Sequence, residues 1–317
     1  MSSPPSGAAR HLPQWGRSEI ILPFIIFTMI WGTTWIVIRD QLGEVPAQWS
    51  ITYRFLIAGV AMAALTRWKG QSLRLGQAGI GAAALLGLLQ FVINFTAVYL
   101  AEHHVTSGLV ATVFALLLIP NSLLGWAFLG HKPGARFAIS SAFAMAGIAM
   151  LFAHELGEHP ARSDQILLGI GLTLAGMLGA SAANVYQALE RVKRFPLFAL
   201  LTWAMLLGAL MNGAIALVFT GLPVIEWRIG YWLGLLYLAL FASALAFSLY
   251  LPVVRKIGPG KAAYSSVLVP IIAMGFSTWL EDYRWTPLAA AGAILALGGM
   301  VGALSRNRSV VPAPDAA

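Results

Sequence analysis

The sequence predicts an all-α integral membrane protein with ten transmembrane helices, arranged as two inverted five-helix repeats. Three observations support this fold class: the composition, the recurrence of apolar runs of span length, and a weak internal repeat. Of the 317 residues, 59% are hydrophobic and 10% are charged, whereas a soluble domain typically carries about 25% charged residues. A lipid bilayer tolerates so apolar a chain, because each run of roughly 20 apolar residues can cross a hydrocarbon core of about 30 Å.

The apolar runs divide the chain into ten predicted spans with short connections. Spans within residues 20–153 form a first repeat and those within residues 166–304 a second, and residues 1–19 and 305–317 are expected to be disordered cytoplasmic tails. No connection is long enough to hold a soluble domain. The predicted spans are Ile20–Ile38, Ala47–Thr66, Gly76–Leu100, Val105–Leu129, Phe137–Ala153, Ile166–Leu189, Leu197–Thr220, Ile229–Val254, Ala262–Leu280 and Trp285–Leu304.

The basic residues predict the orientation of the spans. Of the 20 Lys and Arg residues, fifteen fall on the side of the N-terminus, four fall on the opposite side, and Arg54 lies inside a span. Because cytoplasmic loops are enriched in Lys and Arg, we expect both termini in the cytoplasm and the protein in the cell (inner) membrane. The net charge of +8 therefore reflects topology and does not indicate a nucleic-acid partner. The four residues on the opposite side are Arg39, Arg162, Arg228 and Arg284.

The two halves of the chain resemble each other at an offset of about 150 residues. Pro120 lies mid-span in the fourth predicted helix, and Pro270 lies mid-span in the ninth. Five helices per repeat is an odd number, so the second half enters the membrane from the opposite side, as in many secondary transporters. A mid-span proline kinks a helix and frees a backbone carbonyl. We therefore expect Pro120 and Pro270 to mark bending sites that take part in gating.

The fifth and tenth predicted helices carry small residues at helical spacing. Small side chains let two helix backbones approach closely in lipid, so we expect these helices to pack and not to line a cavity. The residues are Ala138, Ala142, Ala146 and Ala149 in the fifth helix, and Ala289, Gly292, Ala296, Gly299 and Ala303 in the tenth.

Several of these features together resemble a known family. They are Trp31-Gly32-Thr33 in the first helix, Tyr53-Arg54-Phe55-Leu56 in the second, the mid-span Pro120 and Pro270, Glu281, and the glycine-rich last helix. This ordered set resembles the drug/metabolite transporter (DMT) superfamily, specifically its EamA-type ten-helix permeases, and within them the YddG-type amino-acid exporters. The family commonly has Glu where this chain has His131, so a role of that Glu does not transfer.

The resemblance implies that helices 1, 3, 4, 6, 8 and 9 surround a central cavity between the two inverted halves. It also implies export of amino acids and related small metabolites by alternating access, without an enzymatic reaction or a cofactor. The alternative is efflux of multiple drugs or amphipathic cations, because an aromatic, uncharged cavity suits both kinds of substrate. The expected partners are the small-molecule substrate and the lipid bilayer, and we expect a monomer.

Arg54 is the one charged residue that is predicted to lie inside a span. Such a charge is costly and marks a functional site by default, so Arg54 either receives a substrate carboxylate or braces neighbouring groups. Trp31 lies close to mid-span, where its indole face can attract an ammonium group or pack an apolar side chain. The predicted substrate-binding residues are Trp31, Thr34, Arg54, Gln90, Asn94, Tyr99, Asn184, Ser243 and Ser265.

No Asp, Glu or His falls within a predicted span. Proton-coupled antiport needs a group that titrates near neutral pH, and arginine, with a pKa above about 12, does not. We therefore expect facilitated transport down a substrate gradient, without obligatory proton coupling. The same absence argues against an intramembrane protease or metalloenzyme, and the lack of cysteine excludes disulfides and thiolate metal sites.

Overall fold

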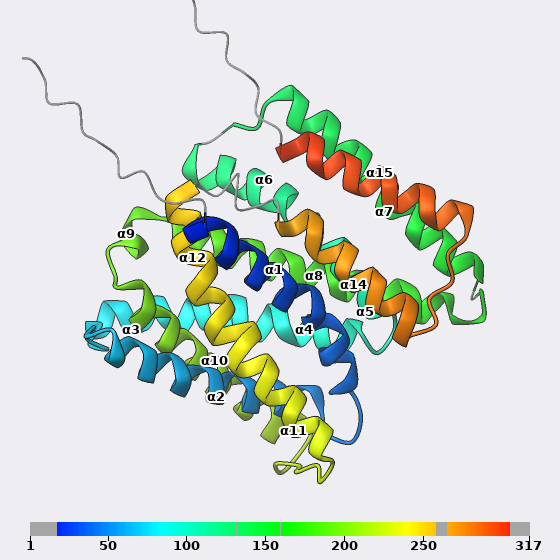
Figure 1. Ribbon diagram of the computed structural model, residues 1–317. Coiled ribbons are helices and arrows are strands. Elements are labelled where there is room, and N and C mark those ends of the chain that lie inside the picture. Colours follow the sequence, from blue (N-terminus) through cyan, green and yellow to red (C-terminus); the bar gives the residue numbers. More distant parts are fainter. Residues whose placement is uncertain (1–17, 131, 159, 258–264, 305–317) are drawn as a thin grey trace, which may run out of the picture.

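The computed structural model describes residues 18–130, 132–158, 160–257 and 265–304. The regular structure in these ranges is helical, with no β-strand (Figure 1), which confirms the all-α prediction. The predicted tails, up to residue 17 and from residue 305, and His131 lie outside the described residues.

The helices of the first half follow the predicted spans closely. They are α1 (Ser18–Asp40), α2 (Ala47–Trp68), α3 (Gly76–Gly87), the π-helical segment η1 (Leu88–Asn94), α4 (Phe95–Ala101), α5 (Ser107–Ala115), α6 (Leu118–Leu129) and α7 (Ala135–Glu158). Together α3, η1 and α4 form one continuous apolar helix.

The second half repeats this order. It contains the short 3-10 turn η2 (Pro160–Arg162), α8 (Ser163–Ala188), α9 (Glu190–Lys193), α10 (Leu197–Phe219), α11 (Ile229–Leu236), the π-helical segment η3 (Tyr237–Leu245), α12 (Ala246–Ile257), α14 (Ser265–Leu280) and α15 (Pro287–Leu304). Here α11, η3 and α12 follow one another without a loop.

Eight segments of the described residues are long and apolar enough to cross a membrane, and they cover the first eight predicted spans in order. The last two predicted spans correspond to α14 and α15, which are apolar but shorter. Helix α14 has 16 residues and begins directly after the gap at residues 258–264. By length and hydropathy, the described residues therefore support eight spans and do not confirm the predicted ten.

The two mid-span prolines have different effects on their helices. The fourth predicted span is interrupted between α5 and α6, where the backbone N–H groups of Leu116 and Leu117 donate to carbonyls three residues earlier at 2.9 and 3.0 Å. Pro120 has no N–H, and its ring crowds the carbonyl four residues before it, so the break falls at this point. By contrast, α14 continues through Pro270.

Two π-helical segments lie at matching places in the two halves. Segment η1 begins at Leu88 and η3 at Tyr237, an offset that agrees with the internal repeat. The sequence predicts ordinary α-helix at both places, so these segments are a finding of the structure. A π segment contains a wider turn than an α-helix and frequently occurs at a functional site.

Helices α7 and α15 pack along each other (Figure 1). A Cβ atom on Gly147 would collide with the backbone of α15, and one on Gly299 would collide with the backbone of α7. The prediction for α15 is largely confirmed, because four of its five small residues are buried; they are Ala289, Gly292, Ala296 and Gly299.

The prediction for α7 chose the wrong face of that helix. All four predicted alanines are exposed, and the buried face of α7 is formed by residues next to them in the sequence. Because alanine is apolar, it is equally suited to a lipid-facing surface, and composition alone does not distinguish the two faces. The exposed residues are Ala138, Ala142, Ala146 and Ala149, and the buried ones are Ser141, Ala144, Gly147 and Ile148.

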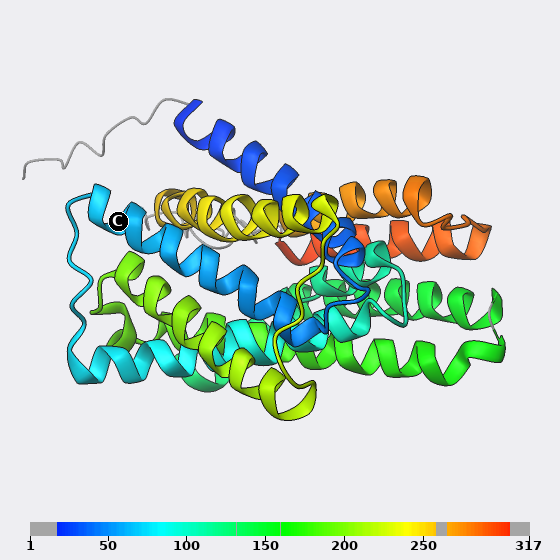
Figure 2. The same ribbon diagram turned by 90° about the horizontal axis from the view of Figure 1, so that it is seen from below.

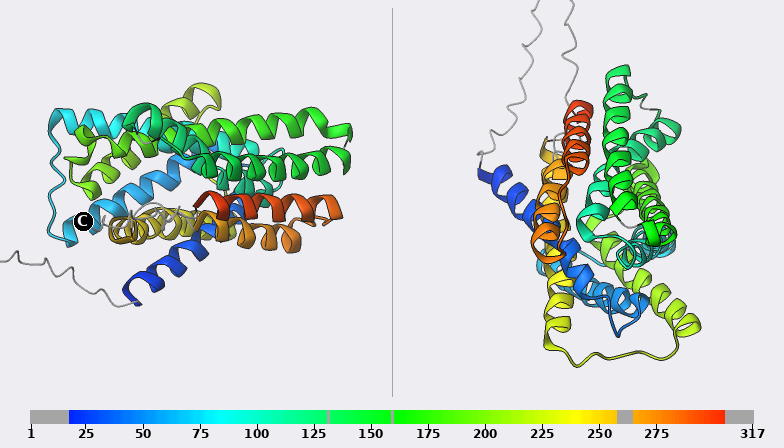
Figure 3. Two further views of the ribbon diagram at one scale, coloured as in Figure 1. Left: turned by 90° about the horizontal axis from the view of Figure 1, so that it is seen from above. Right: turned by 90° about the vertical axis from the view of Figure 1, so that its right-hand side faces the viewer.

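The remaining helices interleave the two halves. Helix α2 packs against α10, α14 packs against α1 and α5, and α8 packs against η1 and α4. Figures 2 and 3 show that α1 is inclined to the other helices. The start of α1 and the end of α15 lie at the same end of the bundle (Figure 1), here named the terminal face. The opposite end, where Glu281 follows α14, is named the Glu281 face.

Candidate substrate cavity

A cavity of about 260 Å³ lies between the two halves. Its lining comes from α1, from η1 and α4, from α5 and α6, from α8, from η3 and α12, and from α14, with Arg54 added by α2. These elements correspond to predicted helices 1, 3, 4, 6, 8 and 9, so the expected set of cavity helices is confirmed. Helices α7 and α15 contribute no lining residue.

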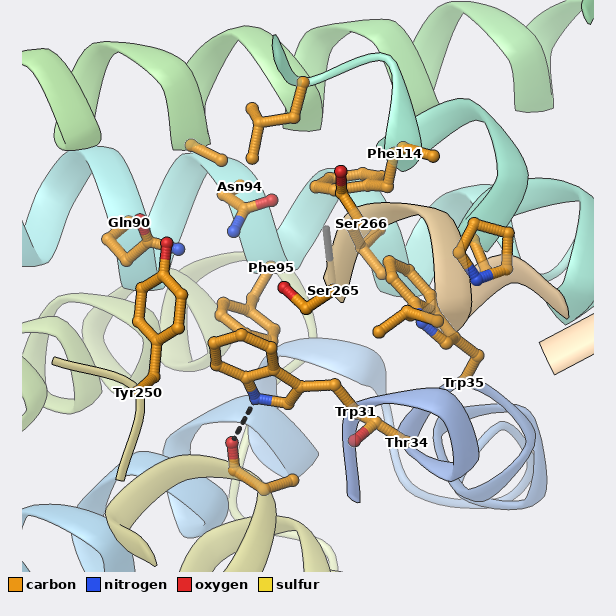
Figure 4. A pocket seen from close by; sticks show the side chains of 18 of the residues that line it. Trp31, Thr34, Trp35, Gln90, Asn94, Phe95, Phe114, Tyr250, Ser265 and Ser266 are labelled. Atoms are coloured by element: carbon orange, nitrogen blue, oxygen red, sulfur yellow. Dashed lines mark hydrogen bonds between the residues drawn. The ribbon is translucent and has the colours of Figure 1, made fainter. Parts of the chain in front are cut away.

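Aromatic side chains form much of the cavity wall. The ring of Trp31 lies with its centroid 5.0 Å from that of Tyr250 and 5.7 Å from that of Phe247. Further along α1, Trp35 contacts Phe114 at 5.2 Å between centroids. Figure 4 shows Tyr250 beside Trp31. Such a wall favours an apolar or aromatic group on the substrate.

Four amide side chains add polar groups to this wall. Gln90 and Asn94 point into the cavity from η1 (Figure 4). On the other side, Asn184 of α8 donates through Nδ2 to Oδ1 of Asn121 at 3.5 Å. Asn94 is 4% exposed, and its Oδ1 has no hydrogen-bond partner among the described residues. Because a buried acceptor is costly to leave unpaired, this oxygen would gain a hydrogen bond from a donor that comes within reach when the cavity wall closes around a substrate.

Arg54 lines the cavity from α2 and is 2% exposed. Its Nε donates to Oγ of Ser243 at 3.3 Å and its Nη1 to the hydroxyl of Tyr99 at 3.4 Å. Its guanidinium carbon lies 4.6 Å from the ring centroid of Phe95, within the range of a cation–π interaction. Among the described residues no carboxylate pairs with Arg54 and its Nη2 has no acceptor. Neutral groups therefore brace this charge and leave it able to receive an anion.

The structure places most of the predicted site residues in the cavity wall. Three of them, Tyr99, Ser243 and Pro120, do not line the cavity. Tyr99 and Ser243 are fully buried behind Arg54 and position it, so they do not line the cavity. Pro120 is buried one residue before the lining residue Asn121. The predicted residues that line the cavity are Trp31, Thr34, Arg54, Gln90, Asn94, Asn184, Ser265 and Pro270.

Sequence reasoning missed several lining residues. Asn121 follows Pro120 and is an amide side chain inside a predicted span, as Gln90, Asn94 and Asn184 are. The same reasoning from residue type and depth could therefore have found it. Apolar residues at span depth give no such signal, because most of them face lipid or a neighbouring helix. The missed residues with the largest side chains are Trp35, Phe95, Phe114, Asn121 and Phe247.

At the Glu281 face a single carboxylate holds helix ends together. Ser107, the first residue of α5, donates its backbone N–H to Glu281 Oε2 at 3.1 Å and its hydroxyl to the same oxygen at 2.6 Å. Arg39, near the end of α1, lies with Nε 3.6 Å from Glu281 Oε1. Glu281 therefore ties α1, α5 and the end of α14 together. A second cavity of about 750 Å³ lies at this face, lined by charged residues that include Arg39, Asp40, Glu155, Arg162 and Glu281.

Close to this network lies an acid that the sequence analysis placed outside the spans. Glu102 follows the last residue of α4 and is 0% exposed. Neither of its carboxylate oxygens has a hydrogen-bond partner among the described residues. Burial raises the pKa of Glu102 well above its usual value, and the nearby carboxylate of Glu281 raises it further. The described residues contain no cluster of three or more His, Asp or Glu side chains that could hold a metal ion.

Comparisons with known proteins agree with this architecture. The model of the EamA-like transporter family matches twice, at residues 19–153 and 167–305. A "Probable amino-acid metabolite efflux pump" of Escherichia coli (strain K12) is 23% identical over 296 residues, which cover 90% of this chain and 94% of that protein. The "Uncharacterized inner membrane transporter YedA" of the same organism is 29% identical over 265 residues, which cover 80% of this chain and 79% of that protein.

A solved crystal structure shares the fold. Its chain is 20% identical, and the two superpose with a TM-score of 0.63 over 91% of this chain and 98% of that chain. One family match on each half of the chain accords with the internal repeat, and the cavity lies where the two halves meet. The chain therefore belongs to the EamA-like transporter family, and it is an integral membrane transporter and not an enzyme.

Proposed function

We propose that this transporter exports amino acids and related small metabolites across the cell (inner) membrane by alternating access. The observation that carries the proposal is a complementary pair of unused hydrogen-bonding groups. Among the described residues the side-chain hydrogen bonds of Arg54 use Nε and Nη1, so Nη2 suits a carboxylate, and the unpaired Oδ1 of Asn94 suits an ammonium group. An α-amino acid presents both groups, and the aromatic wall around Trp31 can receive its side chain. The relative named as an amino-acid metabolite efflux pump supports the same substrate class.

We propose a topology of ten spans with both termini in the cytoplasm. Helix α15 packs along α7, which has span length, and α14 packs between α1 and α5, which belong to spans. These contacts support counting α14 and α15 as the ninth and tenth spans despite their shorter length. The excess of basic residues on the side of the terminal face supports its cytoplasmic position. We also propose a monomer, because residues of a single chain line the cavity.

We infer that the contacts of Glu281 with Ser107 and Arg39 close the Glu281 face, and this supports an inward-facing state for this structure. Release on the far side requires that Ser107 and Arg39 separate from Glu281. Among the described residues no Asp, Glu or His lines the cavity, so substrate binding there exchanges no proton with a cavity side chain. This supports facilitated transport without obligatory proton coupling, driven by the substrate gradient.

Efflux of amphipathic cations is the competing function. A cation in this cavity would meet the positive charge of Arg54 and, among the residues that the structure describes, no acidic side chain, so electrostatics disfavour it. Cation–π contacts with Trp31 and Tyr250 offset this only in part.

Counterflow in proteoliposomes distinguishes the two functions. Vesicles preloaded with an unlabelled amino acid should take up the same labelled amino acid transiently, and vesicles preloaded with tetraphenylphosphonium should show no counterflow of that cation. Protein-free vesicles and the Arg54→Gln variant provide the controls. Counterflow of the cation without counterflow of any amino acid would overturn the proposal.

A further inference from the structure

We propose that Glu102 is a proton-binding site that controls the opening of the Glu281 face. In the closed state Glu102 holds a proton, and it loses that proton when the face opens to water. The proton changes the rate of opening and does not have to cross the membrane. This inference concerns the gate and is independent of which substrate the cavity binds.

The position of Glu102 indicates that the closed state favours the protonated acid. Its side chain is 0% exposed, and both carboxylate oxygens lack a hydrogen-bond partner among the described residues. An ionised carboxylate in such a place is strongly disfavoured, because nothing replaces the water that it loses. Glu281, in contrast, accepts hydrogen bonds from Ser107 and lies beside Arg39. The two neighbouring acids therefore have opposite protonation preferences in the closed state.

The other charges around Glu102 do not reverse this preference. Arg39 of α1 and Arg54 of α2 favour the ionised form, but their effect on the pKa is smaller than those of burial and of Glu281. Helix α5 carries no ionisable side chain, and α8 carries none between Asp164 and Tyr186. The remaining groups that titrate nearby are Tyr99, His103 and His104.

Glu102 also lies on the segment that the gate must move. Residues 102–106 connect α4 to α5, and the next residue, Ser107, is the one that Glu281 holds. Separation of Ser107 from Glu281 would pull on this segment and admit water to Glu102. Once ionised, Glu102 repels Glu281, and this repulsion disfavours closing again.

The sign of the pH effect follows from linkage. Burial raises the pKa of Glu102 in this structure, and water admitted on opening would remove that cause, so the closed state binds the proton more tightly than the open state. Low pH at the Glu281 face therefore favours closure, and rising pH favours opening. The reciprocal statement also holds: opening of the face releases a proton to that side.

A single cysteine can report opening, because the chain has none of its own. Ala111 lies on α5, lines the cavity and is 1% exposed, so Ala111→Cys is covered from the Glu281 face when that face is closed. A membrane-impermeant maleimide added at the Glu281 face would alkylate it only on opening. The alkylation rate should be measured from about pH 5 to about pH 8, with and without Glu102→Gln in the same background.

Each thiol becomes more reactive as pH rises, and this common increase cancels in the ratio of the two rates. The proposal predicts a further increase of at least about fivefold with Glu102 present. With Glu102→Gln, which mimics the protonated acid, alkylation should stay slow and rise only as the thiol itself becomes more reactive. Glu155→Gln is the matched control, because Glu155 is another largely buried acid that lines the cavity at the Glu281 face. It should retain the full pH dependence.

Two results would overturn the proposal. One is an unchanged pH dependence in Glu102→Gln, and the other is its loss in His103→Gln with Glu102 intact. Partial burial and the neighbouring Arg39 and His104 lower the pKa of His103, so this histidine is the natural rival. If Glu102→Gln does not insert into the membrane, Glu102→Asp takes its place, and a pH dependence with a shifted midpoint supports the proposal while an unshifted one contradicts it. The measurement needs no substrate, so its failure would leave the amino-acid proposal untouched.

Discussion

The two π-helical segments occupy equivalent places in the two halves but serve different purposes. In η1 the carbonyl of Phe91 accepts a hydrogen bond from Nδ2 of Asn212 at 2.9 Å. In η3 the carbonyl of Ala242 accepts one from Nε1 of Trp31 at 3.2 Å. A π segment disturbs the regular backbone ladder, and in lipid the disturbed groups need another partner. Both halves meet this need with a side chain from a different helix.

The difference lies in where the partner side chain sits. Asn212 is fully buried on α10 and does not line the cavity, whereas Trp31 forms part of the cavity wall. The same backbone feature therefore supports helix packing in the first half and fixes a substrate-facing ring in the second. Symmetry of the fold does not imply symmetry of the site.

Arg54 is also asymmetric, because it contacts both halves and has no charged counterpart in the second half. Its two side-chain hydrogen bonds reach Ser243 in η3 and Tyr99 in α4, which directly continues η1. It thus links the two helices that contain the π segments. The repeat offset of about 150 residues places no charge at the corresponding part of α10, where the chain reads Thr202-Trp203-Ala204.

The largest effect is expected from Arg54→Gln, which removes the link between the two π-containing helices and the anion site together. A hydrogen bond to a charged group contributes about 1.5–3 kcal/mol, so the affinity for an amino acid should fall by roughly 10- to 150-fold. Affinity should be measured by substrate quenching of tryptophan fluorescence or by the KM of counterflow. Arg54→Lys keeps the charge but loses the planar guanidinium group. Its affinity should lie between those of the unmodified protein and Arg54→Gln.

An unchanged affinity in Arg54→Gln, with a lowered melting temperature, would show that Arg54 is only a structural brace. The sequence left these two roles open, and the structure shows how both can hold at once. The guanidinium is braced through Nε and Nη1 and still faces the cavity.

Much of the fold could be predicted from the sequence, because lipid imposes simple rules on length, hydropathy and charge. The cavity helices and eight of the eleven predicted site or gating positions also lie where expected. The π segments could not be predicted, since one extra residue in a turn leaves an apolar sequence looking the same. Glu102 was missed because the burial of a residue just beyond a helix depends on its neighbours in space, here Arg39 and Glu281.

The next largest effect is expected from Asn212→Leu, and it should fall on stability alone. Nδ2 of Asn212 donates to the carbonyls of Phe91 and Gly208, each at 2.9 Å. Loss of these bonds at a fully buried site should lower stability by about 1–3 kcal/mol, seen as a fall in melting temperature in detergent, with substrate affinity unchanged.

Thr202→Val is the matched control for Asn212→Leu. It lies on the same helix, and its hydroxyl donates to the carbonyl of Phe198 within that helix at 2.8 Å. Its contact with another helix is the longer one to the hydroxyl of Thr66, at 3.4 Å, so its loss should change stability less than that of Asn212. If Asn212→Leu instead weakened substrate binding without lowering the melting temperature, the assignment of η1 to packing would be wrong.

The smallest effect is expected from Trp31→Phe, and it should be divided between stability and affinity. The substitution keeps an aromatic ring against Tyr250 but removes the N–H that pairs with the carbonyl of Ala242. One such hydrogen bond contributes about 1 kcal/mol, so with the effect divided, affinity should fall by at most roughly fivefold. Trp203→Phe loses an equivalent indole bond, to the carbonyl of Leu73 at 2.9 Å, outside the cavity.

The two tryptophan variants together test whether the π segment of the second half shapes the site. Both should lower the melting temperature by a similar amount, because each leaves one carbonyl unpaired. Only Trp31→Phe should weaken substrate binding, since only Trp31 joins the η3 backbone to the cavity wall. Equal losses of affinity in the two variants would mean that the effect is a general one of stability, and that η3, like η1, serves packing.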